Sequence, residues 1–128
     1  DEDDIDSNAN LCNEYYQKAI GIINSNNTRP IYYIFSDNIS RAKETLHKIL
    51  GSTDVHFVDN TYCDPIIDLA LMSSCKHIIT SNSSFSWWAA WLGDHENKQV
   101  LTPYVDITGS VGSWSFDGLI PPDWEIIE

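Results

Sequence analysis

The sequence predicts a protein of the α/β class, with a parallel sheet that carries helices on both faces. Short runs rich in β-branched and aromatic residues alternate with longer runs that have helical periodicity, and Asn, Gly or Pro residues separate them. Strands of about six residues that alternate with helices of about ten imply right-handed crossovers between parallel strands. We therefore expect a single Rossmann-like domain over residues 11–128.

The first half of the chain predicts two helices and two strands. Apolar residues recur at helical spacing from Leu11 to Ile23, and Pro30 ends this pattern. A strand, an amphipathic helix stopped by Gly51 and a second strand are expected at 31–36, 40–50 and 55–59. Residues 1–10, DEDDIDSNAN, are expected to be a solvated, flexible start and not a metal site.

The second half predicts two further strands and two further helices. Asp64 is expected to cap a helix over 65–75, with Pro65 in its first position. A third strand, a Trp-rich helix closed by Gly93 and a fourth strand are expected over 76–81, 85–93 and 98–103. Beyond Tyr104 we expect irregular chain, whose last segment, DWEII, packs back on the sheet.

Composition excludes several classes of function. Seven Lys and Arg against nineteen Asp and Glu give a net charge of -12, which repels the phosphate backbone of nucleic acids. No apolar run approaches the roughly 20 residues that span a bilayer, so we expect a soluble chain. Cys12, Cys63 and Cys75 have neither the pairing nor the spacing of a disulfide framework or a zinc site. Reduced thiols in the cytoplasm are expected.

The segment SNSSFSWWAAWLGD (81–94) contains more candidate binding residues than any other stretch of this length. Ser81 to Ser84 lie between the third strand and the Trp-rich helix, where a parallel sheet binds ligands and a helix start presents N–H groups. Small hydroxyl side chains let a phosphate approach the backbone. The alternative is an ordinary Ser or Asn helix cap. Core packing is expected for most rings of the following helix, since its residues are apolar all round.

Two carboxylates and one further serine are also candidates. Asp68 is the only charge in the run PIIDLALMSSC, so it either faces solvent or points into a cleft. In a cleft, one carboxylate can accept two hydrogen bonds from the paired donors of guanine. Ser36 and Asp37 follow the first strand at the ligand-binding edge, with a turn or helix cap as the alternative for Asp37.

The segments YIFSDN (33–38) and CKHIITSNSSFSWWAAWLG (75–93) resemble the C-terminal part of the α-1,2-fucosyltransferases of glycosyltransferase family 11. The resemblance runs from EYYQKAI (14–20) to PPDWEII (121–127). It implies the Rossmann-like half of a GT-B enzyme that binds GDP-fucose without a metal or other cofactor. By this resemblance Asp68 contacts guanine, and Ser83 and Ser84 contact the diphosphate. The full set of residues expected at the nucleotide sugar is Ser36, Asp37, Asp68, Asn82, Ser83, Ser84 and Phe85.

The sequence also departs from that family. The family carries a His-x-Arg-Arg-Gly-Asp motif whose arginine binds the diphosphate, and this motif is absent from the sequence. We therefore expect the C-terminal portion of a longer inverting enzyme that transfers fucose to a galactose-containing glycan, with its N-terminal half as partner and no activity of its own. The general base is not assigned. The expected location is the bacterial cytoplasm, at the inner face of the membrane. A non-catalytic nucleotide- or carbohydrate-binding module, or a phosphoacceptor domain that uses Asp37, is the alternative.

Overall fold

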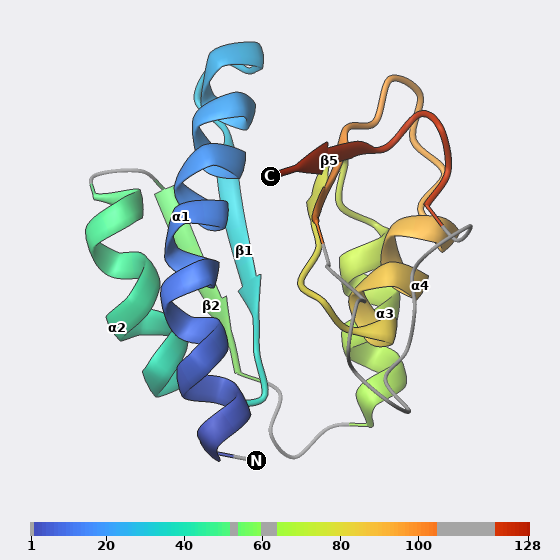
Figure 1. Ribbon diagram of the computed structural model, residues 1–128. Helices are drawn as coiled ribbons and strands as arrows, with labels where there is room; N and C mark the ends of the chain where they lie inside the picture. The colour runs from blue at the N-terminus through green and yellow to red at the C-terminus, as the bar shows by residue number, and fades with distance from the viewer. Residues whose placement is uncertain (1, 52–53, 60–63, 105–119) are drawn as a thin grey trace. The chain divides into compact units, whose positions relative to one another are not determined.

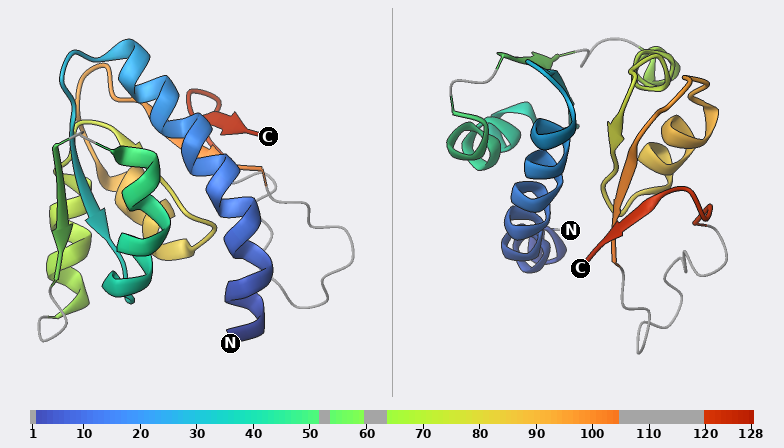
Figure 2. Two further views of the ribbon diagram at one scale, coloured as in Figure 1. Left: turned by 90° about the vertical axis from the view of Figure 1, so that its left-hand side faces the viewer. Right: turned by 90° about the horizontal axis from the view of Figure 1, so that it is seen from above.

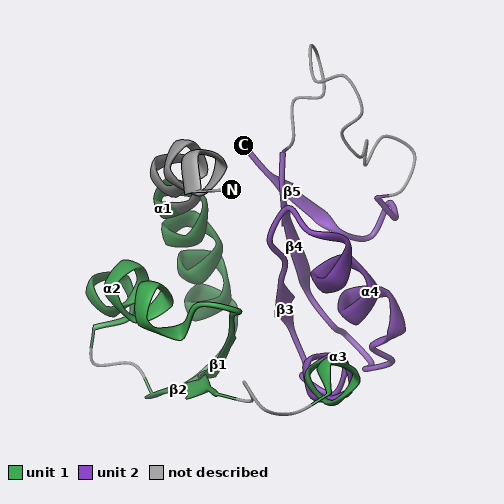
Figure 3. Ribbon diagram, turned by 90° about the horizontal axis from the view of Figure 1, so that it is seen from below, with its two compact units in different colours: residues 1–68 green, residues 69–128 purple. Residues whose placement is uncertain are grey.

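The computed structural model (Figure 1) describes residues 2–51, 54–59, 64–104 and 120–128, with side chains from residue 13 onward. The chain divides into two compact units, residues Asp1–Asp68 and Leu69–Glu128 (Figure 3). We call them unit 1 and unit 2. The boundary falls inside helix α3 (Pro65–Ser73). Each unit contains parallel strands flanked by helices, which confirms the α/β class.

Unit 1 contains helix α1 (Glu2–Asn26), strand β1 (Ile31–Phe35), helix α2 (Ile39–Leu50) and strand β2 (Asp54–Val58). Both strands and α2 lie within a residue or two of the predicted ranges. Helix α1 begins at Glu2, so the prediction that it starts at Leu11 was wrong.

The two strands of unit 1 form a parallel pair in which Tyr32 lies opposite Val55 and Tyr33 opposite His56. Helices α1 and α2 lie on the same face of this pair (Figure 2). The Tyr32 hydroxyl fixes this layer by donating to Asn24 Oδ1 of α1 at 2.7 Å. On the other face the Tyr33 ring stacks on His56 and stays half exposed. Side chains that alternate along β1 therefore meet different surroundings.

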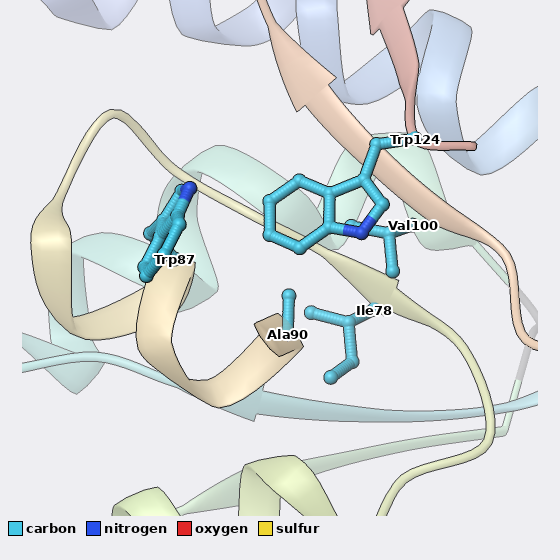
Figure 4. Close-up of a cluster of buried hydrophobic side chains, with 5 residues drawn as sticks. All are labelled: Ile78, Trp87, Ala90, Val100 and Trp124. Atoms are coloured by element: carbon cyan, nitrogen blue, oxygen red, sulfur yellow. The ribbon is translucent and has the colours of Figure 1, made fainter. Parts of the chain in front are cut away.

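Unit 2 contains the second part of α3, strand β3 (Ile78–Ile79), helix α4 (Ser84–Leu92), strand β4 (Val100–Pro103) and strand β5 (Glu125–Ile127). Its three strands pair in parallel in the order β3-β4-β5. The return of DWEII to the sheet is confirmed by β5. Helix α4 packs on the sheet through a core cluster (Figure 4), formed by Ile78, Trp87, Ala90, Val100 and Trp124.

The sequence predicted one sheet, whereas the described strands form two, β1-β2 and β3-β4-β5. The sequence predicted a strand over 76–81, but β3 has two residues, and its hydrogen bonds run to the β4 side, where Thr80 N–H also donates to Leu101 O at 2.9 Å.

Local cap chemistry sets the helix ends as predicted. Asp64 Oδ1 accepts the Ile66 N–H at 3.1 Å, and Pro65 begins α3. Gly51 ends α2 at a positive φ of 53°, a conformation that favours glycine. At Gly93, after α4, an added Cβ would lie 3.0 Å from Ser73 O, so the close approach of the chain to α3 favours glycine there. None of the described helices combines the length and apolar content needed to span a membrane.

Candidate functional site

Three serine hydroxyls meet where β3 gives way to α4. The Oγ atoms of Ser81, Ser83 and Ser86 lie 3.0 Å (81 to 83), 3.2 Å (81 to 86) and 3.1 Å (83 to 86) apart. We call these three residues the serine cluster. The strand fixes one end of it, because the Thr80 N–H is held in the ladder to Leu101. The helix fixes the other end, because Ser86 lies in its first turn.

Helix capping explains the conformation of this segment. Ser83 is the N-cap of α4, with extended backbone, and its Oγ accepts the Ser86 N–H at 3.3 Å. Its carbonyl accepts the Trp87 N–H at 3.2 Å. The cap role proposed as the alternative is therefore correct for Ser83. The N–H groups of Ser84 and Phe85 precede these bonds and are donors that a helix start leaves for other partners.

The serine cluster and the start of α4 suit an anion. Hydroxyl protons, two backbone N–H groups and the positive end of the helix dipole all favour negative charge. The same segment exposes four residues to solvent, Asn82, Ser83, Ser84 and Phe85, and Phe85 is 38% exposed. The structure thus brings four of the predicted contact residues together on one short stretch of unit 2.

Sequence reasoning missed Ser86. Its side chain is only 5% exposed, although it stands beside the exposed Ser83 and Ser84. The signal was present, because Ser83-x-x-Ser86 has the spacing of a capping box, in which the third residue of the helix interacts with the cap.

Ser36 and Asp37 lie in the loop between β1 and α2 of unit 1, and both are exposed. The Ser36 Oγ makes two local bonds, accepting from Asn38 N–H at 3.0 Å and donating to Asn38 O at 3.1 Å. The cap of α2 is Asn38, whose Oδ1 accepts the Arg41 N–H, so Asp37 does not have the cap role. A shallow polar hollow beside this loop is lined by Asn38, Ser40, Arg41, Glu44 and Thr45.

Asp68 occupies the first turn of α3 and is partly buried. None of the side chains of α3 is fully buried, and Ile66 and Leu71 are exposed. Asp68 closes unit 1, whereas Ser83 and Ser84 belong to unit 2. Its contact with guanine, and the convergence of Ser36 and Asp37 with the serine cluster, stay predictions.

The tryptophans of α4 correct one expectation. Trp87 is buried at 9% exposure and packs against Trp124, with ring centroids 5.9 Å apart (Figure 4). Trp88 and Trp91 remain 47% and 53% exposed, so the prediction that most of these rings are in the core was wrong. A nine-residue helix on a sheet buries one side, which here holds Ser86, Trp87, Ala89 and Ala90.

The basic groups described around α4 act at its C-terminal end. Lys98 Nζ donates to Ala90 O at 3.0 Å and to Gly93 O at 2.6 Å, which places its charge at the negative end of the helix dipole. His95 Nε2 lies 2.7 Å from Ser74 O.

His77 lies beside the β3-β4 ladder, where its Nδ1 accepts the Gln99 N–H at 2.8 Å. Desolvation lowers the pKa of His77, with smaller effects from the charges of Lys76 and His95.

The family model described as "Glycosyl transferase family 11" matches residues 6–106, a range that includes every candidate residue named above. The chain belongs to glycosyl transferase family 11.

Relatives in this family come from bacteria and mammals. The chain is 37% identical over 91 residues to an Escherichia coli protein named "O-antigen biosynthesis glycosyltransferase WbnK", which covers 70% of the chain and 29% of that protein. It is 35% identical over 95 residues to an Escherichia coli "Alpha-1,2-colitosyltransferase", covering 73% and 32%. It is 30% identical over 79 residues to "Galactoside alpha-(1,2)-fucosyltransferase 2" of Mus musculus, covering 61% and 22%.

The family 11 chain thus spans about a third or less of the length of these relatives. No solved structure matches it.

Proposed function

We propose that this chain is the donor-binding part of an inverting fucosyltransferase, which binds GDP-fucose and transfers L-fucose to a galactose 2-hydroxyl on a glycan. The observation that carries the proposal is the serine cluster at the start of α4, which lies within the range that the family model matches. The names of the relatives support an α-1,2-linked sugar transfer.

In this proposal the diphosphate lies against the start of α4. Ser81 and Ser83 turn hydroxyl protons toward it, Ser84 and Phe85 offer backbone N–H groups, and Asn82 flanks it. Donors held in place before reaction stabilise the charge that develops on the departing GDP. Asp68 accepts the paired donors of guanine, and Ser36 and Asp37 contact the sugar hydroxyls of the donor.

Other parts of the reaction lie outside these residues. A net charge of -12 offers little attraction to a diphosphate, and Lys98 is engaged at the far end of α4. We propose that an N-terminal half supplies the diphosphate-binding arginine, the acceptor site and the general base for the galactose hydroxyl. The donor is the substrate, no metal or cofactor is required, and the reaction takes place at the cytoplasmic face of a bacterial membrane.

The sugar that is transferred has a second candidate. Colitose is named for the relative that is 35% identical, so a colitosyl nucleotide is the alternative donor. The nucleotide contacts proposed above do not depend on which of the two sugars is bound.

A non-catalytic carbohydrate-binding module is the second candidate function. The observation that favours it is the exposure of Trp88 and Trp91, whose faces offer surfaces on which sugar rings can stack. The α/β architecture and the serine cluster favour the donor-binding function instead.

Isothermal titration calorimetry of the chain with GDP, GDP-fucose, ADP and a free galactose-containing oligosaccharide tests the two candidates. Donor binding predicts heat with GDP and GDP-fucose and none with ADP or the oligosaccharide. Oligosaccharide binding without GDP binding would reject donor binding in favour of the carbohydrate module. Release of GDP from GDP-fucose by the isolated chain would contradict the assignment of the diphosphate clamp and the base to an N-terminal half.

A further inference from the structure

Ser86 is a buried hydroxyl on an otherwise apolar side of α4. Its neighbours on that side are Trp87, Ala89 and Ala90, and it is only 5% exposed. A buried hydroxyl destabilises a fold unless its hydrogen bonds are made. An alanine would fill the same position without this requirement, so the bonds that Ser86 makes indicate what the hydroxyl is for.

Those bonds all run to the loop between β3 and α4. The Ser86 Oγ accepts the Ser81 N–H at 3.1 Å. Its single proton is shared between the carbonyls of Ser83, at 3.1 Å, and Ser81, at 3.3 Å. Ser86 therefore ties both ends of the segment 81–83 to the first turn of the helix.

The same geometry determines what Ser83 and Ser81 can offer to a ligand. Ser83 Oγ already accepts the Ser86 N–H, and Ser81 Oγ lies 3.0 Å away as a second neighbour. A hydroxyl has two acceptor sites and one proton. The Ser83 hydroxyl is therefore held beside the Ser81 hydroxyl and the Ser86 N–H, on a side chain that is exposed to a ligand.

We propose that Ser86 is a positioning residue of the donor site, which holds residues 81–83 so that their hydroxyl and backbone groups meet the diphosphate. This inference rests on the proposed function for the identity of the ligand. The family match over residues 6–106 supports a nucleotide-sugar donor independently of the serine geometry.

Ser86→Ala tests the positioning without any ligand. The variant keeps the backbone N–H that Ser83 caps, and it removes only the bonds of the hydroxyl. Hydrogen exchange of the Ser81 amide, followed by NMR in the 128-residue chain, should become about five- to tenfold faster, as expected for one lost hydrogen bond. The Thr80 amide, which bonds to Leu101, should be unchanged, and Ser86→Thr should restore protection at Ser81.

Two exchange results would overturn the proposal. An unchanged Ser81 amide in Ser86→Ala would show that the hydroxyl does not hold the loop. Equal acceleration at Thr80 and Ser81 would show that Ser86 supports the whole sheet. Ser73→Ala is the matched control in unit 2, since its hydroxyl bonds only within α3, to Ala70 O, and we expect no change at Ser81.

Ligand binding gives the second readout. Ser86→Ala should weaken GDP binding about five- to tenfold and leave guanosine binding unchanged, because only GDP carries the diphosphate. An equal loss for both ligands would overturn positioning of the diphosphate contacts. If the unsubstituted chain binds guanosine as tightly as GDP, the proposed function fails at this site, while the exchange experiment still decides whether Ser86 holds the loop.

Discussion

The two strand-to-helix loops that carry candidate residues use similar turn chemistry for different results. In unit 1, after β1, the Ser36 hydroxyl makes both of its hydrogen bonds with the backbone of Asn38, and Asn38 caps α2. In unit 2, after β3, the cap Ser83 belongs to a triangle of three hydroxyls. The comparison teaches that similar turn chemistry can close a loop on itself, as at Ser36, or gather several hydroxyls beside a helix start, as at Ser83.

Charge separates the two loops further. The loop after β1 contains Asp37, and a carboxylate opposes the approach of a phosphate while it can accept from sugar hydroxyls. No charged residue occurs from Thr80 to Gly93, which covers the loop after β3 and all of α4, and the loop lies at the positive end of α4. This difference in charge is the reason for proposing that the first loop contacts the sugar hydroxyls of the donor and the second loop contacts its diphosphate.

The support of the second loop by the core of unit 2 gives the largest expected effect. Trp87→Ala removes a buried ring next to Ser86 and should lower the free energy of unfolding by about 3–5 kcal/mol. Trp88→Ala, the matched control on the exposed side, should cost less than about 1 kcal/mol. Urea unfolding followed by circular dichroism measures both values. Equal losses would show that the exposed and buried sides of α4 contribute alike.

Base recognition is expected to have the next largest effect. Asp68→Asn replaces an acceptor by a donor that faces the donors of guanine, and should weaken GDP binding by roughly thirty- to a hundred-fold, or about 2–3 kcal/mol. The change in the free energy of unfolding should be smaller than this loss of binding, because Asp68 is only partly buried. Calorimetry with Asp94→Asn, an exposed aspartate after α4, is the control. Unchanged GDP binding in Asp68→Asn would reject the guanine contact.

The two helix caps provide a direct test of the comparison. Asn38→Ala and Ser83→Ala each remove one cap and should each lower the free energy of unfolding by about 1 kcal/mol. GDP affinity should fall about fivefold or more in Ser83→Ala alone, since of the two caps only Ser83 is proposed to contact the diphosphate. A matching loss of affinity in Asn38→Ala would mean that the two loops do not differ as proposed.

The smallest expected effect is a pH dependence from His77. Its Nδ1 must be unprotonated to accept the Gln99 N–H between β3 and β4, and desolvation lowers its pKa in the folded chain. The pKa of His77 is about 6.5 in the unfolded chain and lower in the folded chain. As pH falls, the unfolded chain therefore takes up the proton on His77 first, and the free energy of unfolding decreases until the pH reaches the folded-state pKa. Urea unfolding between pH 5 and 8 should show a weaker pH dependence in His77→Gln. An identical slope in both proteins would exclude this contribution.

Local chemistry made much of the fold predictable. The order of strands and helices, the cap at Asp64 and the stops at Gly51 and Gly93 depend on residues within a few positions of one another. The polar segment at Ser81 to Ser84 was identifiable for the same reason, because turn and cap residues cluster where a strand passes into a helix.

Tertiary packing decided what the pattern left open. In FSWWAAWL every residue except Ser86 is apolar, so periodicity does not select the buried side, and only contact with Ile78, Val100 and Trp124 determines that Trp87 is inside and Trp91 outside. The same contact buries Ser86 and turns a cap sequence into a closed hydroxyl triangle. The sequence alone determined which residues stand at the strand end; the rotation of α4 against the sheet, set by long-range packing, decided that the Ser83 side chain is exposed and the Ser86 side chain buried.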